Sequence, residues 1–132
     1  MSFFACRMRA GLSQEDVVLR TGCAGSSVQH WDHGVVPSKH YITYFCKLFG
    51  VTRGELLREE PRPTPDMEKL LTLAEDTERF LILTGIDPGT VRGWRSGAVA
   101  QIGTVRLISS GLGVPVASLL KIETEETRYK QP

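Results

Sequence analysis

The sequence has few of the features that mark secreted, membrane-spanning or metal-binding proteins. Its 132 residues include only three cysteines, Cys6, Cys23 and Cys46, an odd number without the spacing of metal ligands. The first residues do not form a signal peptide, and no run of 18 apolar residues occurs. These absences predict a cytoplasmic protein with reduced thiols and no membrane partner.

The chain also has no large excess of positive or negative side chains, since its formal net charge is +1. That value alone does not identify a nucleic-acid partner. The distribution is uneven, because residues 1–58 carry seven basic and four acidic side chains, whereas residues 66–122 carry six of each. The first half of the chain is therefore the more basic half.

An internal repeat organises the chain. Thr21–Gly34 aligns with Thr84–Gly97, with Thr, Gly, Val, Trp and Gly at identical positions. The register continues without a gap to Leu57 and Leu120, giving ten identities in 37 positions. Unrelated segments would share roughly two or three, so we infer a duplication of one small unit.

The first copy has the pattern of five short helices. Apolar spacing, caps and glycine stops predict helices at Phe3–Ala10, Gln14–Arg20, Gly25–His33 and Pro37–Phe49, followed by a short helix that carries Leu56 and Leu57. Ser13 is the expected N-cap of the second helix, and Gly22 suits a left-handed turn after it. Trp31, three residues after Val28, is expected in the core rather than at a stacking site.

A proline-rich segment separates the copies. Residues 59–65, Glu-Glu-Pro-Arg-Pro-Thr-Pro, are expected to form an extended linker that is neither helix nor sheet. The second copy repeats the helices, with Asp87-Pro88 as a strong helix start and Gly103 and Gly111 weakening a helix over Thr104–Leu112. The predicted domains are residues 1–58 and 66–122, followed by a flexible tail at 123–132.

No catalytic or metal-binding pattern emerges. The sequence offers no Ser/His/Asp series, no paired acids and no glycine-rich phosphate loop. His30, His33 and His40 with Cys23 could suggest zinc, but Cys23 corresponds in the repeat to Ile86 at a core position. We therefore expect no enzymatic activity, no cofactor and no metal.

A helix followed by a short turn with glycine and then a second helix is the helix-turn-helix arrangement. Its second helix enters the major groove of DNA. The first copy resembles the Cro/C1-type (xenobiotic-response-element) helix-turn-helix family. The resemblance lies in the following segments, in order and spacing: Gly11–Val17, Thr21-Gly22, Trp31–Gly34, Pro37-Ser38, and Leu48–Val51 through Leu56-Leu57. It implies an all-α protein of two tandem five-helix, lambda-repressor-like helix-turn-helix domains.

The resemblance also implies roles for individual residues. Gln14 falls where the family contacts a phosphate and braces the reading helix, and Lys39, with His40, falls at a further phosphate contact. The outward face of the reading helix would contact bases through Ser26, Ser27, Gln29 and His30. Arg7 and Asp32 match a pair that ties the first helix to the reading helix.

The second copy departs from this pattern. Its reading helix offers Thr90 and Arg92, and the Arg7–Asp32 pair is replaced by Leu70 and Arg95. We expect Arg95 to be free to meet phosphate. The second copy either reads an adjacent half-site or serves for dimerisation, and its neutral charge favours dimerisation.

The sequence thus predicts a sequence-specific DNA-binding transcriptional regulator, a small repressor of phage or plasmid type. Its expected partners are double-stranded operator DNA and a second copy in a homodimer. The alternative is a protein-interaction module, such as an antirepressor, antitoxin or scaffold, on a fold that has lost DNA binding. The short side chains of Ala24–Ser27 and the low net charge favour this alternative.

Overall fold

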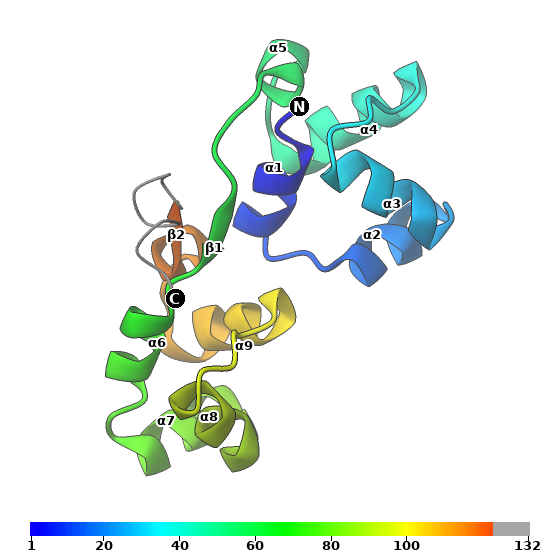
Figure 1. Cartoon of the computed structure of the whole chain (residues 1–132). Coiled ribbons are helices and arrows are strands. Elements are labelled where there is room, and N and C mark those ends of the chain that lie inside the picture. The colour runs from blue at the N-terminus through cyan, green and yellow to red at the C-terminus, as the bar shows by residue number, and fades with distance from the viewer. Residues whose placement is uncertain (123–132) are drawn as a thin grey trace. The chain divides into compact units, whose positions relative to one another are not determined.

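A computed structural model describes residues 1–122, which are predominantly helical (Figure 1). These residues divide into two compact units, Met1–Pro63 together with Ile122, and Thr64–Lys121. The N-terminal unit contains five α-helices: α1 (Phe3–Arg9), α2 (Gln14–Thr21), α3 (Gly25–Asp32), α4 (Lys39–Phe49) and α5 (Arg53–Leu57). The predicted flexible tail, 123–132, lies outside the described residues.

An aromatic cluster forms the centre of the N-terminal unit. The Phe3 ring lies 4.9 Å from the Phe45 ring and 5.8 Å from the Trp31 ring, measured between centroids. Val28 and Leu56 are fully buried in the same core. Trp31 is only 6% exposed, which confirms its predicted place in the core rather than at a stacking site.

The C-terminal unit contains four α-helices and a final 3₁₀ helix. These are α6 (Met67–Leu73), α7 (Thr77–Thr84), α8 (Pro88–Arg95), α9 (Ile102–Leu112) and η1 (Val116–Leu119). The fifth helix of the second copy is therefore present as a 3₁₀ helix rather than an α-helix. In the first copy Thr52 and Glu55 form a capping box that starts α5, whereas η1 begins after Pro115 and has no side-chain cap.

The repeat in the sequence is also a repeat in local geometry. Helices α2, α3 and α4 begin and end at positions that the repeat aligns with the first and last residues of α7, α8 and α9. The Thr21 hydroxyl donates to the Val17 carbonyl at 2.7 Å, and the Thr84 hydroxyl donates to the Phe80 carbonyl at the same distance. Each threonine precedes a glycine with φ of 71°, a conformation that costs other residues more. The two copies thus make the same turn.

The linker is not free of sheet structure, contrary to the prediction. Strand β1 (Pro63–Pro65) pairs with β2 (Leu120–Ile122) in a two-stranded sheet. Alternate residues of a strand direct their N–H groups to the same side. Thr64 and Asp66 therefore share a side, and the Asp66 N–H donates to the Leu119 carbonyl at 2.9 Å. Prolines tolerate an edge strand when their missing donors lie on the unpaired side.

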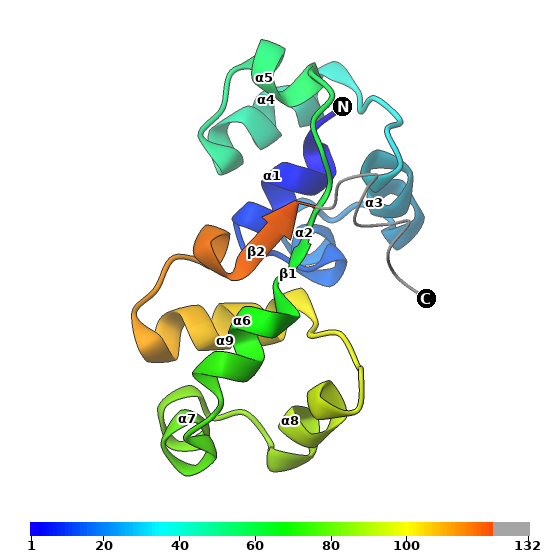
Figure 2. The ribbon, with the colours of Figure 1, turned by 60° about the vertical axis from the view of Figure 1, so that its left-hand side comes forward.

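Helix α9 extends beyond its predicted start and is not interrupted by its glycines. It covers Ile102–Leu112, the same length as α4. Figure 2 shows α7 beneath the C-terminal part of α9. A side chain at Gly111 would collide with the Leu83 carbonyl oxygen and would place its Cβ 2.9 Å from Thr84 Cα. Gly111 therefore permits a close approach of two helix backbones.

Candidate nucleic-acid interface

Helices α2 and α3 are held at a fixed angle by a cap and a turn. The Ser13 hydroxyl accepts from the Asp16 N–H at 3.0 Å, and the Asp16 carboxylate accepts from the Ser13 N–H at 2.8 Å. At the other end of α2, the Thr21 hydroxyl also accepts from the Cys23 N–H at 3.3 Å. Backbone groups at both ends of α2 are thus satisfied by neighbouring residues of the same segment.

A buried polar network fixes the inner side of α3. The Arg7 guanidinium donates to both oxygens of Asp32, at 3.0 and 2.7 Å, and also to the Leu12 carbonyl at 2.8 Å. The amide of Gln14 donates to Asp32 at 2.7 Å. Arg7 and Asp32 are 5% and 4% exposed, so this bidentate pair ties α1, α2 and α3 together away from water. The expected Arg7–Asp32 pair is present, and Gln14 braces α3 as expected.

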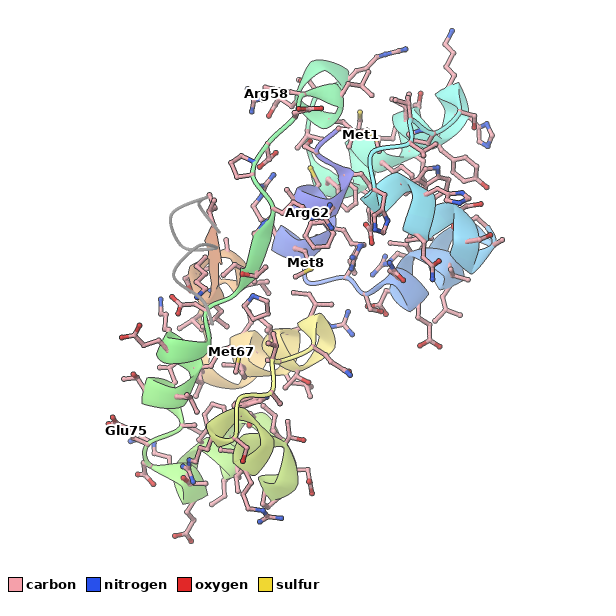
Figure 3. The ribbon with its side chains drawn as sticks, in the orientation of Figure 1. Met1, Met8, Arg58, Arg62, Met67 and Glu75 are labelled. Carbon is pink, nitrogen blue, oxygen red and sulfur yellow. The ribbon has the colours of Figure 1, made fainter. Side chains whose placement is uncertain are left out.

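The linker supplies a contact that sequence reasoning missed. The Arg62 guanidinium donates to the backbone carbonyl of Asp32, the last residue of α3, at 2.7 Å. It also lies over the Phe4 ring of α1, 3.7 Å from the centroid. Figure 3 shows Arg62 beside α1. A cation at a helix C-terminus is favourable, so the linker stabilises the end of α3. Arg62 is distant from Asp32 in the sequence. The only signal in the sequence for this contact is a single arginine between two prolines.

The outer face of α3 carries the predicted reading residues. Ser26, Gln29 and His30 are exposed and Ser27 is half-buried, while Val28, Trp31 and Asp32 face the interior. Lys39 and His40 are exposed on the first turn of α4. The N-cap of α3 is Ala24, whose side chain makes no cap. The structure therefore brings the predicted reading residues onto one face of α3. We call this face, together with Lys39 and His40, the α3–α4 surface.

The stretch of chain that forms α3 and α4 carries no exposed carboxylate. Between Val17 and Gly54 the sequence holds a single carboxylate, Asp32, and its side chain is buried and paired with Arg7. The same stretch contains four Lys and Arg residues and all three histidines of the chain. Glu15 and Asp16 lie at the start of α2, outside it. The α3–α4 surface is therefore suited to a polyanion, although the whole chain is nearly neutral.

The corresponding helix of the C-terminal unit is built differently. Asp87 caps α8, and its carboxylate accepts from the Gly89 N–H at 2.9 Å. A carboxylate therefore occupies the helix end where an incoming anion would meet free N–H groups. Thr90 is half-buried and Arg92 is exposed. Arg92 and Arg95 are the two long, exposed side chains among the predicted readers of this unit.

Arg95 is not free, contrary to expectation. Its guanidinium donates to the Thr77 hydroxyl at 2.7 Å and to the Ala74 carbonyl at 3.4 Å. Thr77 and Arg95 are the repeat counterparts of Gln14 and Asp32. A side-chain hydrogen bond therefore joins α2 to α3 in one copy and α7 to α8 in the other. The donor lies on α2 in the first copy and on α8 in the second. Arg95 consequently braces α8 against the start of α7.

Within residues 1–122, no group of three His, Cys, Asp or Glu side chains could hold a metal ion. The three cysteines are unpaired, and burial raises the pKa of the Cys6 thiol, which keeps it protonated and unreactive. None of the helices of this range is long and apolar enough to cross a membrane.

Comparison with known proteins gives no relative. No protein-family model, curated protein sequence or solved structure matches the chain. A functional assignment therefore depends on the residues and geometry described above.

Proposed function

We propose that this chain is a sequence-specific DNA-binding transcriptional regulator, a small repressor built from two tandem, lambda-repressor-like helix-turn-helix domains. The observation that carries the proposal is the α3–α4 surface. It exposes polar readers on one helix face, and the one carboxylate of α3 is buried against Arg7. A helix presented in this way fits the major groove, whose walls are phosphates.

The proposed contacts follow from side-chain chemistry. The Gln29 amide carries a donor and an acceptor that match the N6 and N7 edge of adenine, and His30 and Ser26 offer single hydrogen bonds to base edges. Lys39 would contact a phosphate and add affinity without sequence preference. A twofold dimer would then read a palindrome with half-sites about 34 Å apart or a multiple of that.

One feature favours the alternative, a protein-interaction module. Val35 and Val36 follow α3 and are 53% and 59% exposed. Apolar side chains beside a reading helix suit a protein partner as well as the thymine methyl group. In this alternative the α3–α4 surface binds a protein rather than DNA.

A salt titration of DNA binding separates the two functions. The full chain is expected to bind a DNA duplex taken from upstream of its own gene. The affinity should fall steeply as the salt concentration rises, because the basic side chains that contact phosphates release counterions from the DNA. Lys39→Ala should weaken binding to all sequences and lower the logarithmic salt slope by about one. Fluorescence anisotropy of a labelled duplex measures both quantities.

Arg53→Ala is the matched control, because Arg53 is also exposed and also begins a helix. Helix α5 lies apart from α2 and α3 in Figures 1 and 2, so this variant should keep the wild-type slope. No binding even at low salt would contradict the regulator and favour the protein-interaction module. An equal loss of DNA affinity in the two variants would indicate non-specific electrostatic attraction.

A further inference from the structure

The segment that follows α5 is attached to the N-terminal helices by two side chains. The Glu60 carboxylate accepts hydrogen bonds from the guanidinium of Arg9, the last residue of α1, one of them 3.3 Å long. Two residues later, Arg62 donates to the Asp32 carbonyl and lies over the Phe4 ring. Figure 1 shows this segment extended, and alternate side chains of an extended segment project to the same side. We call residues 60–62 the linker clamp.

Prolines restrict the backbone of the linker clamp. Pro61 lies between the two anchoring residues, and Pro63 follows them. The proline ring holds its own φ at about −65°, and the residue before a proline is kept out of the helical region. Glu60 and Arg62 each precede a proline, so the segment has little backbone freedom to lose when it docks. The linker clamp is therefore largely preorganised for its contacts.

The linker clamp meets α3 at the residue where other contacts of this helix converge. The Asp32 carboxylate is bound by Arg7 of α1 and by Gln14 of α2. Its backbone carbonyl is bound by Arg62. The Phe4 ring lies beside both guanidinium groups, 3.7 Å from that of Arg62 and 5.2 Å from that of Arg7. The last residue of α3 is thus held by α1, α2 and the linker together.

Arg62 completes the cap at the C-terminal end of α3. The N–H groups of residues 33–35 donate to carbonyls of residues 29–31, in the last turn of the helix. The carbonyl of Asp32 accepts from Arg62 instead. A cation at this place also opposes the negative end of the helix dipole. The linker therefore fixes the end of the helix that carries Gln29 and His30.

We propose that Arg62 is a positioning residue for α3: by holding the C-terminal end of this helix, it fixes the orientation in which the α3–α4 surface meets DNA. Arg62 contacts no base and acts through Asp32. The choice of DNA as the ligand rests on the proposed function, whereas the linker clamp is a feature of the N-terminal unit alone. The part of the chain that reads DNA accordingly extends to Pro63, beyond the end of α5.

Sequence discrimination separates positioning from stability. Affinity is measured for the upstream duplex and for a duplex of the same composition in scrambled order. A variant that only unfolds part of the protein lowers both affinities by one factor, because it lowers the fraction of competent protein. A displaced α3 loses base contacts but keeps phosphate contacts. Arg62→Ala should therefore lower the ratio of the two affinities roughly fivefold or more. Arg62→Lys keeps a cation and a donor and should restore most of it.

Arg58→Ala is the matched control, because it removes the same charge four residues earlier. Arg58 is exposed, and Figure 3 shows it at the end of α5. This variant should keep the wild-type ratio of affinities. An unchanged ratio in Arg62→Ala, or an equal fall in Arg58→Ala, would overturn the proposal.

Amide hydrogen exchange of the full chain without DNA tests the linker clamp independently. Arg62→Ala should speed exchange at residues 33–35 selectively, because their hydrogen bonds belong to the end of α3 that Arg62 holds. Arg58→Ala should leave these amides unchanged. Wild-type exchange at residues 33–35 in Arg62→Ala would also overturn the proposal. A wild-type chain that binds neither duplex would contradict the proposed function, and exchange would then decide alone whether Arg62 holds α3.

Discussion

Asp32→Ala should lower the free energy of unfolding of the N-terminal unit by about 3–5 kcal/mol, the usual cost of removing one partner from a buried ion pair. The large effect arises because Arg7 would stay buried at 5% exposure without its counter-ion. Gln14 would also lose the acceptor that its amide uses, at 2.7 Å. The variant removes the junction of three helices rather than one surface contact.

Arg95→Ala is the matched control for this variant, since Arg95 holds the same position in the second copy. Arg95 is exposed and donates to a hydroxyl and a carbonyl rather than to a charge. Its loss should cost about 1 kcal/mol or less. Urea unfolding followed by tryptophan fluorescence resolves the units, because Trp31 lies in one and Trp94 in the other. Each variant is therefore combined with a Trp→Phe change in the unit that it does not alter. Equal losses of unfolding free energy in the two variants would show that the buried Arg7–Asp32 pair has no special role in stability.

Gly111→Ala should destabilise the C-terminal unit by about 1–3 kcal/mol, although alanine is the better helix former. The added methyl group would meet the Leu83 carbonyl and Thr84 Cα, which are backbone atoms that cannot rotate away. Helices α7 and α9 would have to separate. The same urea measurement, with Trp94 as the reporter, gives the free energy.

Gly103→Ala tests the same substitution in the same helix without the collision. No atom lies within 4 Å of a Cβ built at Gly103, so the variant should stabilise the unit by about 0.5–1 kcal/mol through helix propensity. The two glycines of α9 are thus expected to respond with opposite signs. A stabilising Gly111→Ala would contradict the close approach of α7 and α9.

Local rules predicted most of the helices because their causes lie within a few residues. The Ser13 cap, the left-handed Gly22 and the apolar spacing of Val28 and Trp31 are all visible in the sequence. The repeat strengthened the prediction, since each turn signal occurred twice. The exposed face of α3 was likewise predictable, because it is the side of the helix opposite the apolar residues.

The remaining features depend on residues that are distant in sequence. Arg62 reaches the end of α3 from the linker, and no local pattern announces such a contact. The β1–β2 pairing depends on which side of the strand the proline nitrogens face. The sequence suggested that Gly111 weakens a helix. Only the neighbouring backbone of Leu83 explains why a glycine is needed at this position.

The two copies therefore share a scaffold but differ in their surfaces. In the N-terminal unit the one carboxylate of α3 is neutralised by Arg7, whereas in the C-terminal unit Asp87 caps the equivalent helix. This difference is the basis of our proposal that the N-terminal unit, rather than the C-terminal unit, contacts DNA.

Backbone amide mapping tests DNA contact by α3 most directly. Proton–nitrogen spectra of the full chain would be recorded during a titration with the upstream duplex. We expect the largest shifts in residues 25–30 and at Lys39, and we expect the signals of Ile82 and Leu83 to stay in place. Shifts centred on α7 and α9, or no shifts at low salt, would contradict this expectation.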